Sequence, residues 1–195
     1  MSFLSDRVKS LEADLKATPP RHYVYSDLPF AIFAYPPEQE WEMRREISLL
    51  ETRLTQATAR QVVTISLADL MWQAVEASEG INEVMALEQA RGFEAAQAQV
   101  QDYLSDPDWQ PLPDLLEARL RDLEPDTTIG VIVRAGALAP NIYRVSKLLD
   151  EMKGRTRVPC VLFMPATSEG AASIRFMGIS ENEGRGSYHT RVYID

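Results

Sequence analysis

Four short runs of consecutive apolar residues divide the chain, and each is typical of a strand buried on both faces of a sheet. They cover residues 30–35, 62–65, 129–133 and 158–164. We expect Phe33, Ile132, Val161 and Leu162, which lie within three of these runs, to be almost fully buried in adjacent strands. Runs of this kind, joined by helices, indicate a parallel sheet that is covered on both sides.

Between these runs, apolar residues recur with the spacing of a helix. In the segment after the first run, Met43, Ile47, Leu50 and Leu54 fall on one helical face. The same spacing predicts helices over residues 1–16, 37–54, 67–75 and 140–152. Buried strands that alternate with amphipathic helices predict a three-layer α/β sandwich.

Two segments near the C-terminus alternate apolar with polar residues, as half-exposed strands do. They cover residues 172–178 and 188–194, and we expect an antiparallel pair at one edge of the sheet. Residues 80–122 show only helical patterns and are rich in acidic residues, which predicts a helical insertion. The prediction is a single α/β domain, residues 1–195, with a mostly parallel central sheet of about four parallel strands, the antiparallel edge pair and this insertion.

The charge of the chain is negative and unevenly distributed. The formal net charge is −9. Residues 129–195 contain nine Lys and Arg against six Asp and Glu, so the remaining residues carry −12. An acidic body opposes the phosphate charge of nucleic acids, and we therefore expect no strong direct DNA binding by the isolated protein.

The composition also argues against a membrane, disulfide or metal protein. No apolar run approaches the roughly 20 residues that a membrane-spanning helix needs, and no secretory leader is recognisable. Cys160 is the only cysteine, so an intramolecular disulfide is excluded and a reducing, cytoplasmic location is expected. His22 and His189 are the only histidines, and their separation makes a zinc site improbable.

The loop after the third run is the best candidate for a ligand site. In a parallel sheet, ligands bind where the strands end at their carboxyl edge. Arg134 ends the run, and a helix beginning near Pro140 would direct free backbone amides toward the same space, so an anion site formed by Arg134, Gly136, Asn141 and Arg144 is expected there. Alternatively, Arg134 pairs with a carboxylate of the acidic helices and is purely structural.

No catalytic constellation is recognisable. Neither a Gly-x-x-x-x-Gly-Lys loop nor a Gly-x-Gly-x-x-Gly loop occurs, and no carboxylate ends any of the four runs. Ser168 and His189 lack the third group and the turn that a nucleophile and its base require. We therefore expect a protein that is not an enzyme and has no cofactor.

Several segments of the chain resemble those of a known family. They are residues 33–45 (Phe-Ala-Tyr-Pro-Pro-Glu-Gln-Glu-Trp-Glu-Met-Arg-Arg), 134–140 continuing to 144 and 147–149, 158–165, 176–178 and 188–191. In this order they are similar to the BrxB family, a small component of the BREX bacteriophage-exclusion systems. The likeness runs over nearly the whole chain and is weakest in residues 80–122.

The resemblance implies a role in antiviral defence beside other BREX components. These include an alkaline-phosphatase-like PglZ protein, an adenine methyltransferase and a large ATPase, and the resemblance implies no enzymatic activity for this subunit. We expect an adaptor that docks to the PglZ-type protein through Arg175, His189 and Arg191 on the C-terminal strands. The alternative is a small-molecule or nucleotide-binding regulator that uses the crevice around Arg134, and a hydrolase is a distant third.

Overall fold

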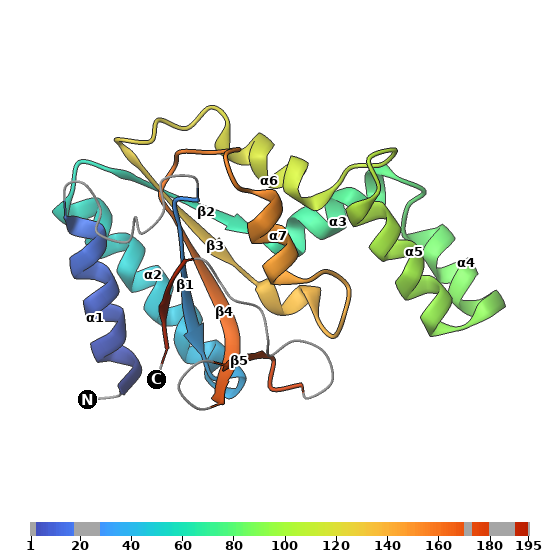
Figure 1. The fold of residues 1–195 in the computed structure, drawn as a ribbon, viewed down its shortest axis with the longest axis horizontal. Coiled ribbons are helices and arrows are strands. Elements are labelled where there is room, and N and C mark those ends of the chain that lie inside the picture. Colours follow the sequence, from blue (N-terminus) through green and yellow to red (C-terminus); the bar gives the residue numbers. More distant parts are fainter. Residues whose placement is uncertain (1–2, 18–27, 170–172, 180–189, 195) are drawn as a thin grey trace.

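Five parallel strands form the centre of the computed structural model, which describes residues 3–17, 28–169, 173–179 and 190–194 (Figure 1). Their order across the sheet is β2-β3-β4-β1-β6, and β5 pairs with β4 outside this path. The strands are β1 (Phe30–Tyr35), β2 (Gln61–Ser66), β3 (Thr128–Val133), β4 (Cys160–Glu169), β5 (Ser173–Phe176) and β6 (Arg191–Tyr193). All four predicted buried runs are strands of this sheet.

The two C-terminal strands do not form the predicted edge pair. β5 is antiparallel, but it pairs with the far half of the long strand β4, where Thr167 faces Arg175. β6 is parallel and pairs with β1, where Ala31 faces Arg191. Alternation of apolar and polar residues reports a half-exposed strand, and an edge strand of either direction satisfies it. The pattern therefore predicted strands here but not their partners or their direction.

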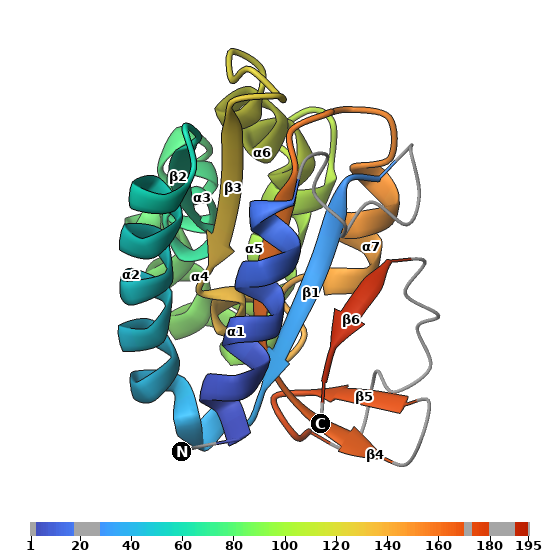
Figure 2. The same cartoon turned by 90° about the vertical axis from the view of Figure 1, so that its left-hand side faces the viewer.

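Helices cover both faces of the sheet, and Figure 2 looks onto the face that carries the first two helices of the chain. The helices of the described residues are α1 (Phe3–Lys16), α2 (Glu40–Ala57), α3 (Leu67–Ala77), α4 (Ile81–Arg91), α5 (Phe93–Ser105), α6 (Leu112–Leu120) and α7 (Val145–Glu151), with short 3-10 helices at Pro37–Gln39 and Ala135–Leu138. α1 and α2 pack on one face, and α3, α6 and α7 pack on the other. The three-layer α/β sandwich is thus confirmed.

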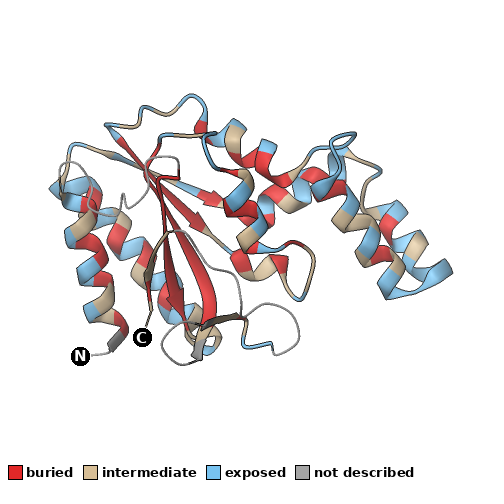
Figure 3. Ribbon diagram, in the orientation of Figure 1, coloured by how far each residue is buried: buried red, intermediate tan, exposed pale blue. Residues whose placement is uncertain are grey.

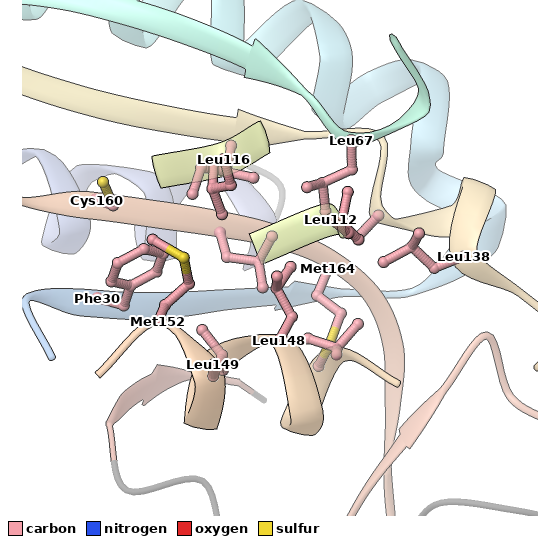
Figure 4. Packing of buried hydrophobic residues seen from close by; sticks show 14 of the residues in the cluster. Phe30, Leu67, Leu112, Leu116, Leu138, Leu148, Leu149, Met152, Cys160 and Met164 are labelled. Carbon is pink, nitrogen blue, oxygen red and sulfur yellow. The ribbon is translucent and has the colours of Figure 1, made fainter. Parts of the chain in front are cut away.

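The alternation of side chains along β1 explains the two cores. Ala31, Phe33 and Tyr35 belong to the cluster under α1 and α2. Phe30 and Ile32 belong to the cluster under α3, α6 and α7, which Figure 4 shows from close by. Every residue of β1 is buried, because successive side chains enter opposite cores. The four residues predicted at the centre, Phe33, Ile132, Val161 and Leu162, are each at most 1% exposed.

A close approach of two strands occurs where Gly130 of β3 faces Cys160 of β4. A Cβ atom placed on Gly130 would lie 2.6 Å from the Cys160 Sγ atom, far inside contact distance. The thiol is fully buried and donates to the Val158 carbonyl at 3.3 Å. Burial raises the pKa of this thiol well above its ordinary value. Only glycine fits opposite the cysteine at this register.

The predicted helical insertion, residues 80–122, consists of two parts with different roles. α6 is a core helix, since Leu112, Leu116 and Leu120 are buried against the sheet with α3 and α7. α4 and α5 form an antiparallel hairpin, Ile81–Ser105, that stands away from the sheet (Figures 1 and 3). We call this hairpin the arm. Within the described ranges, no helix is both long and apolar enough to cross a membrane.

Candidate functional site

Two adjoining cavities lie at the carboxyl edge of the sheet, where the sequence predicted a crevice. The inner cavity, of about 230 Å³, lies between α2 and the sheet. The outer cavity, of about 270 Å³, lies against the loop after β3 and the middle of β4. Glu40, Arg44 and Arg134 line both of them. We call the two cavities together the crevice.

The first turn of α2 forms one wall of the crevice. The Tyr35 hydroxyl, at the end of β1, donates to Glu40 Oε2, and Arg44 Nε donates to Glu40 Oε1 at 2.7 Å. Arg44 also lies over the ring of Trp41, 4.7 Å from its centroid. Burial, together with the hydrogen bond to Glu40, raises the pKa of Tyr35 far above its usual range. The tyrosine is therefore a permanent donor, and Glu40 already has two partners.

Arg134 differs from Arg44 in that its charge is not compensated. It is exposed at the end of β3, and no hydrogen-bond or ion-pair partner for its guanidinium is found among residues 3–17, 28–169, 173–179 and 190–194. Its backbone is left-handed, with φ 61° and ψ 34°, which is uncommon for a residue with a long side chain. The alternative prediction, an ion pair with the acidic helices, is not seen within this described part of the chain.

The other three residues of the predicted anion site are only partly assembled around Arg134. Gly136 lines the outer cavity. The backbone carbonyl of Asn141 accepts a hydrogen bond from Gln101 of α5, and the exposed Arg144 precedes α7. Neither of these two residues lines the crevice in the part of the chain that the structure describes.

The prediction of a helix beginning near Pro140 was wrong, because α7 begins at Val145. The amides of Ile142 and Tyr143 both donate to the Leu138 carbonyl, which closes a tight turn instead. Leu138 and Tyr143 are buried in the main core, and this turn places their side chains there. The predicted helix over residues 140–152 included Ile142 and Tyr143, which belong to an irregular segment before α7.

The C-terminal strands carry the residues that were predicted to dock a partner. Arg191 of β6 forms an ion pair with Asp14 of α1, with Nη2 and Oδ2 2.7 Å apart, and the Tyr193 hydroxyl donates to the same oxygen at 2.7 Å. Arg175 lies in β5, half-buried. His189 lies outside the described residues. Arg191 therefore joins the last strand to the first helix, in addition to any contact with a partner.

The arm exposes large apolar side chains, and the sequence alone did not single them out. Phe93 is 60% exposed and Met85 50% exposed. Trp72 and Trp109, at the base of the arm, are also exposed, and the Trp109 ring packs edge-on against Tyr103 at 5.2 Å. The arm shares a small core with the end of α3, formed by Val75 of α3 together with Val84, Ala96 and Tyr103 of the arm. The sequence did contain one indication of this exposure. The apolar residues of α4 are spread around the helix and form no single apolar face that could pack on the sheet.

Clusters that could hold a metal are not found among the described residues, where no three His, Cys, Asp or Glu side chains come together suitably.

Comparison with curated proteins and with solved structures gave no match. The family model described as BREX protein BrxB matches residues 63–191. This range covers more than half of the chain, from β2 through the arm and the loop of Arg134 to the start of β6. The chain therefore belongs to the BrxB family, whose members are components of BREX phage-defence systems.

Proposed function

We propose that this protein is a non-enzymatic adaptor of a BREX assembly, and that it docks to the PglZ-type protein through its arm. The observation that carries this proposal is the exposure of Met85 and Phe93 on a hairpin that stands away from the sheet (Figure 3). Exposed apolar residues scattered singly are ordinary, but here they gather on one projecting element.

Burial of these side chains by a partner would supply a large part of the binding free energy. Full transfer of a Met or Phe side chain from water to an apolar environment is worth about 1.5–3 kcal/mol, and roughly half of each side chain is still exposed here. Only Val84 of α4 is buried within the protein, so most of this helix surface is available for contact. Bulky side chains that fill pockets on a partner are the usual centres of binding energy.

The charge of the arm defines the kind of surface that it fits. Its carboxylates outnumber its one basic residue, Arg91. They are Glu83, Glu88, Glu94 and Asp102. A complementary surface is basic at its rim and has apolar pockets at its centre. We assign that surface to the PglZ-type protein, the partner that the family resemblance implies.

The C-terminal strands are the second docking surface to be tested. β6 is the last strand in the sheet order of the described residues, and edge strands offer backbone groups for pairing. Charge reversal at Arg191 would also place a carboxylate beside Asp14, so it would disturb the fold as well as the surface. Arg175→Glu is therefore the cleaner probe of this edge.

Co-elution with the PglZ-type protein of the same BREX system on size exclusion tests the proposal. The wild-type pair should elute as one complex, and the double variant Met85→Glu, Phe93→Glu should weaken it by at least tenfold in Kd. Leu49→Glu is the matched control, because Leu49 is an exposed apolar residue of α2, outside the arm. It should leave the complex unchanged.

Two results would contradict parts of this proposal. A complex that resists the arm variant but is lost with Arg175→Glu would move the docking surface to the C-terminal strands. Failure of the wild-type protein to co-elute with any BREX component would refute the adaptor function itself. Raising the salt concentration should weaken the complex, because a charged rim is screened beyond about 8 Å at physiological ionic strength.

A further inference from the structure

The crevice is separate from the arm, and its charges are arranged for a ligand of a definite kind. Glu40 and Arg44 form an ion pair, so their charges cancel at the shared wall. Among the residues that the structure describes, Arg134 is left as the uncompensated cation of the outer cavity, and the other residues that line this cavity carry no charge. The described lining of the outer cavity therefore has a net positive charge within an acidic protein. Such a site selects an anion against the general field of the molecule.

Arg134 has the chemistry to hold a phosphate group. A guanidinium donates through a planar fork that matches two oxygens of a phosphate, and such charged hydrogen bonds are stronger than neutral ones. The side chain is in place because the left-handed backbone at φ 61° turns the chain sharply at the end of β3. Glycine adopts this conformation freely, whereas arginine rarely does, so a folding requirement alone would favour glycine here.

The inner cavity has a lining suited to a small body that carries hydroxyl groups. Its floor is apolar, with Ile47, Val133 and Phe163. Its rim bears hydrogen-bonding groups, among them the Ser48 hydroxyl and the Glu51 carboxylate, which accepts from Thr64. A ligand with hydroxyl donors can bond to such acceptors while its carbon skeleton contacts the floor.

We propose that the crevice binds a small phosphate monoester of a polyhydroxylated body, with the phosphate at Arg134 and the body in the inner cavity. A free sugar phosphate and a nucleotide share this chemistry. The inference is independent of the adaptor function, because the crevice and the arm have no lining or exposed residue in common.

Calorimetry and thermal unfolding with defined probes test the proposal. Ribose 5-phosphate represents a free sugar phosphate, and adenosine 5′-monophosphate represents a nucleotide. Ribose alone and inorganic phosphate alone represent the two parts of such a ligand. At least one monoester should bind and raise the Tm, at least tenfold more tightly than either half, since a ligand that binds only the folded state stabilises it. The stronger monoester identifies the source.

Arg134→Gly removes the guanidinium and relaxes the left-handed backbone, so its Tm without ligand should be no lower than that of the wild type. Its affinity for the monoester should fall at least tenfold. Ser48→Leu should weaken the monoester but not inorganic phosphate, because it obstructs only the inner cavity. Arg121→Ala, an exposed arginine that does not line the crevice, should bind as the wild type does.

Several outcomes would overturn the proposal. They are no binding of either monoester at millimolar concentration, equal affinity of inorganic phosphate and the monoesters, and unchanged affinity in Arg134→Gly. If Arg121→Ala lost as much affinity as Arg134→Gly, the proposal would also be overturned. The loss would then come from the change in net charge of the protein and not from the crevice. None of these results depends on whether the protein binds the PglZ-type partner.

Discussion

At the scale of single residues, the contact between Gly130 and Cys160 sets a strict limit on substitution. Gly130→Ala would place a Cβ atom 2.6 Å from the cysteine sulfur, and both atoms belong to strands in the middle of the sheet. Relief of the clash needs the fully buried Cys160 side chain to adopt another rotamer or one strand to shift, which costs about 1–3 kcal/mol in a packed core. Urea denaturation should show a loss of stability in this range.

Gly136→Ala is the matched control for that experiment. A Cβ atom there would lie 3.5 Å from Pro165 and 3.6 Å from Met177, which is ordinary contact. Its free energy of unfolding should stay within about 0.5 kcal/mol of the wild type. Equal stability of the two variants would show that the Cys160 side chain or the two strands accommodate the added Cβ atom without cost, and it would contradict the packing described here.

Glu12 gives a second prediction at this scale, and it concerns pH. Burial on its own raises the pKa of this carboxyl, but hydrogen bonds from Lys16 and Arg53, each 2.6 Å long, outweigh burial and lower it. A lowered pKa means that the stabilisation is present above the ordinary value of 4.5 and is lost as the pH falls through the folded-state pKa. Arg53 belongs to α2, so the pair joins the two helices of one face.

Glu12→Gln should therefore destabilise the protein at pH 7 and matter less in acid. The expected loss at pH 7 is about 1–2 kcal/mol, toward the lower end for charged hydrogen bonds because both basic partners are partly exposed. Chemical denaturation of both proteins at pH 7 and near pH 3 measures the difference. A gap that stays constant or widens in acid would show that Glu12 acts through packing and not through its charge.

At the scale of elements, α4 and α6 both lie in the segment predicted as a helical insertion, but only α6 packs against the sheet. Leu116→Ala in α6 removes a fully buried side chain from the main core, and it should cost about 2–5 kcal/mol. Met85→Ala in α4 removes an exposed side chain and should change stability by less than about 0.5 kcal/mol. Thermal unfolding of the two variants would measure both; a large loss at Met85 would mean that the arm is covered in the isolated protein.

The sequence pattern was sufficient for elements whose surroundings are uniform. β1 and β4 are apolar on both faces, so an unbroken apolar run identifies them, and the stripe of Met43 and Leu50 identifies α2. The pattern failed where the burial of a segment does not match its secondary structure. The segment of Leu138 and Tyr143 has core residues without α-helical geometry, and α4 has apolar residues of which only Val84 is buried.

The crevice was predictable only in part. Arg134 could be found because it ends a buried run, and the ends of parallel strands meet at one edge. Arg44 and Glu40 could not be found in the same way, because their place beside Arg134 depends on how α2 crosses the sheet. The crossing of a helix is decided by packing between residues distant in sequence, which no local pattern reports.

At the scale of the whole molecule, the net charge of −9 opposes contact with nucleic acids. The isolated protein should bind duplex DNA at physiological salt with a Kd no tighter than about 10⁻⁶ M, as nonspecific binding requires a basic footprint. Fluorescence anisotropy with a labelled duplex at several salt concentrations measures this. A submicromolar affinity that falls steeply with salt would show a basic surface that the charge distribution does not account for.

Because Cys160 is fully buried, the rate at which its thiol is modified measures how often the core of the protein opens. It is the only thiol in the sequence, and a labelling reagent reaches it only when β3 and β4 separate or when the helices that cover it move away from the sheet. In native buffer, modification should therefore be slower than in urea by a factor on the order of 10³ or more, the range of ordinary unfolding equilibria. Mass spectrometry of timed samples would follow the modification, and labelling within minutes would show that the core around Cys160 opens locally. A partner bound to the arm or a ligand bound in the crevice should lower the rate of Cys160 modification, so binding can be measured on a protein that carries no label beforehand.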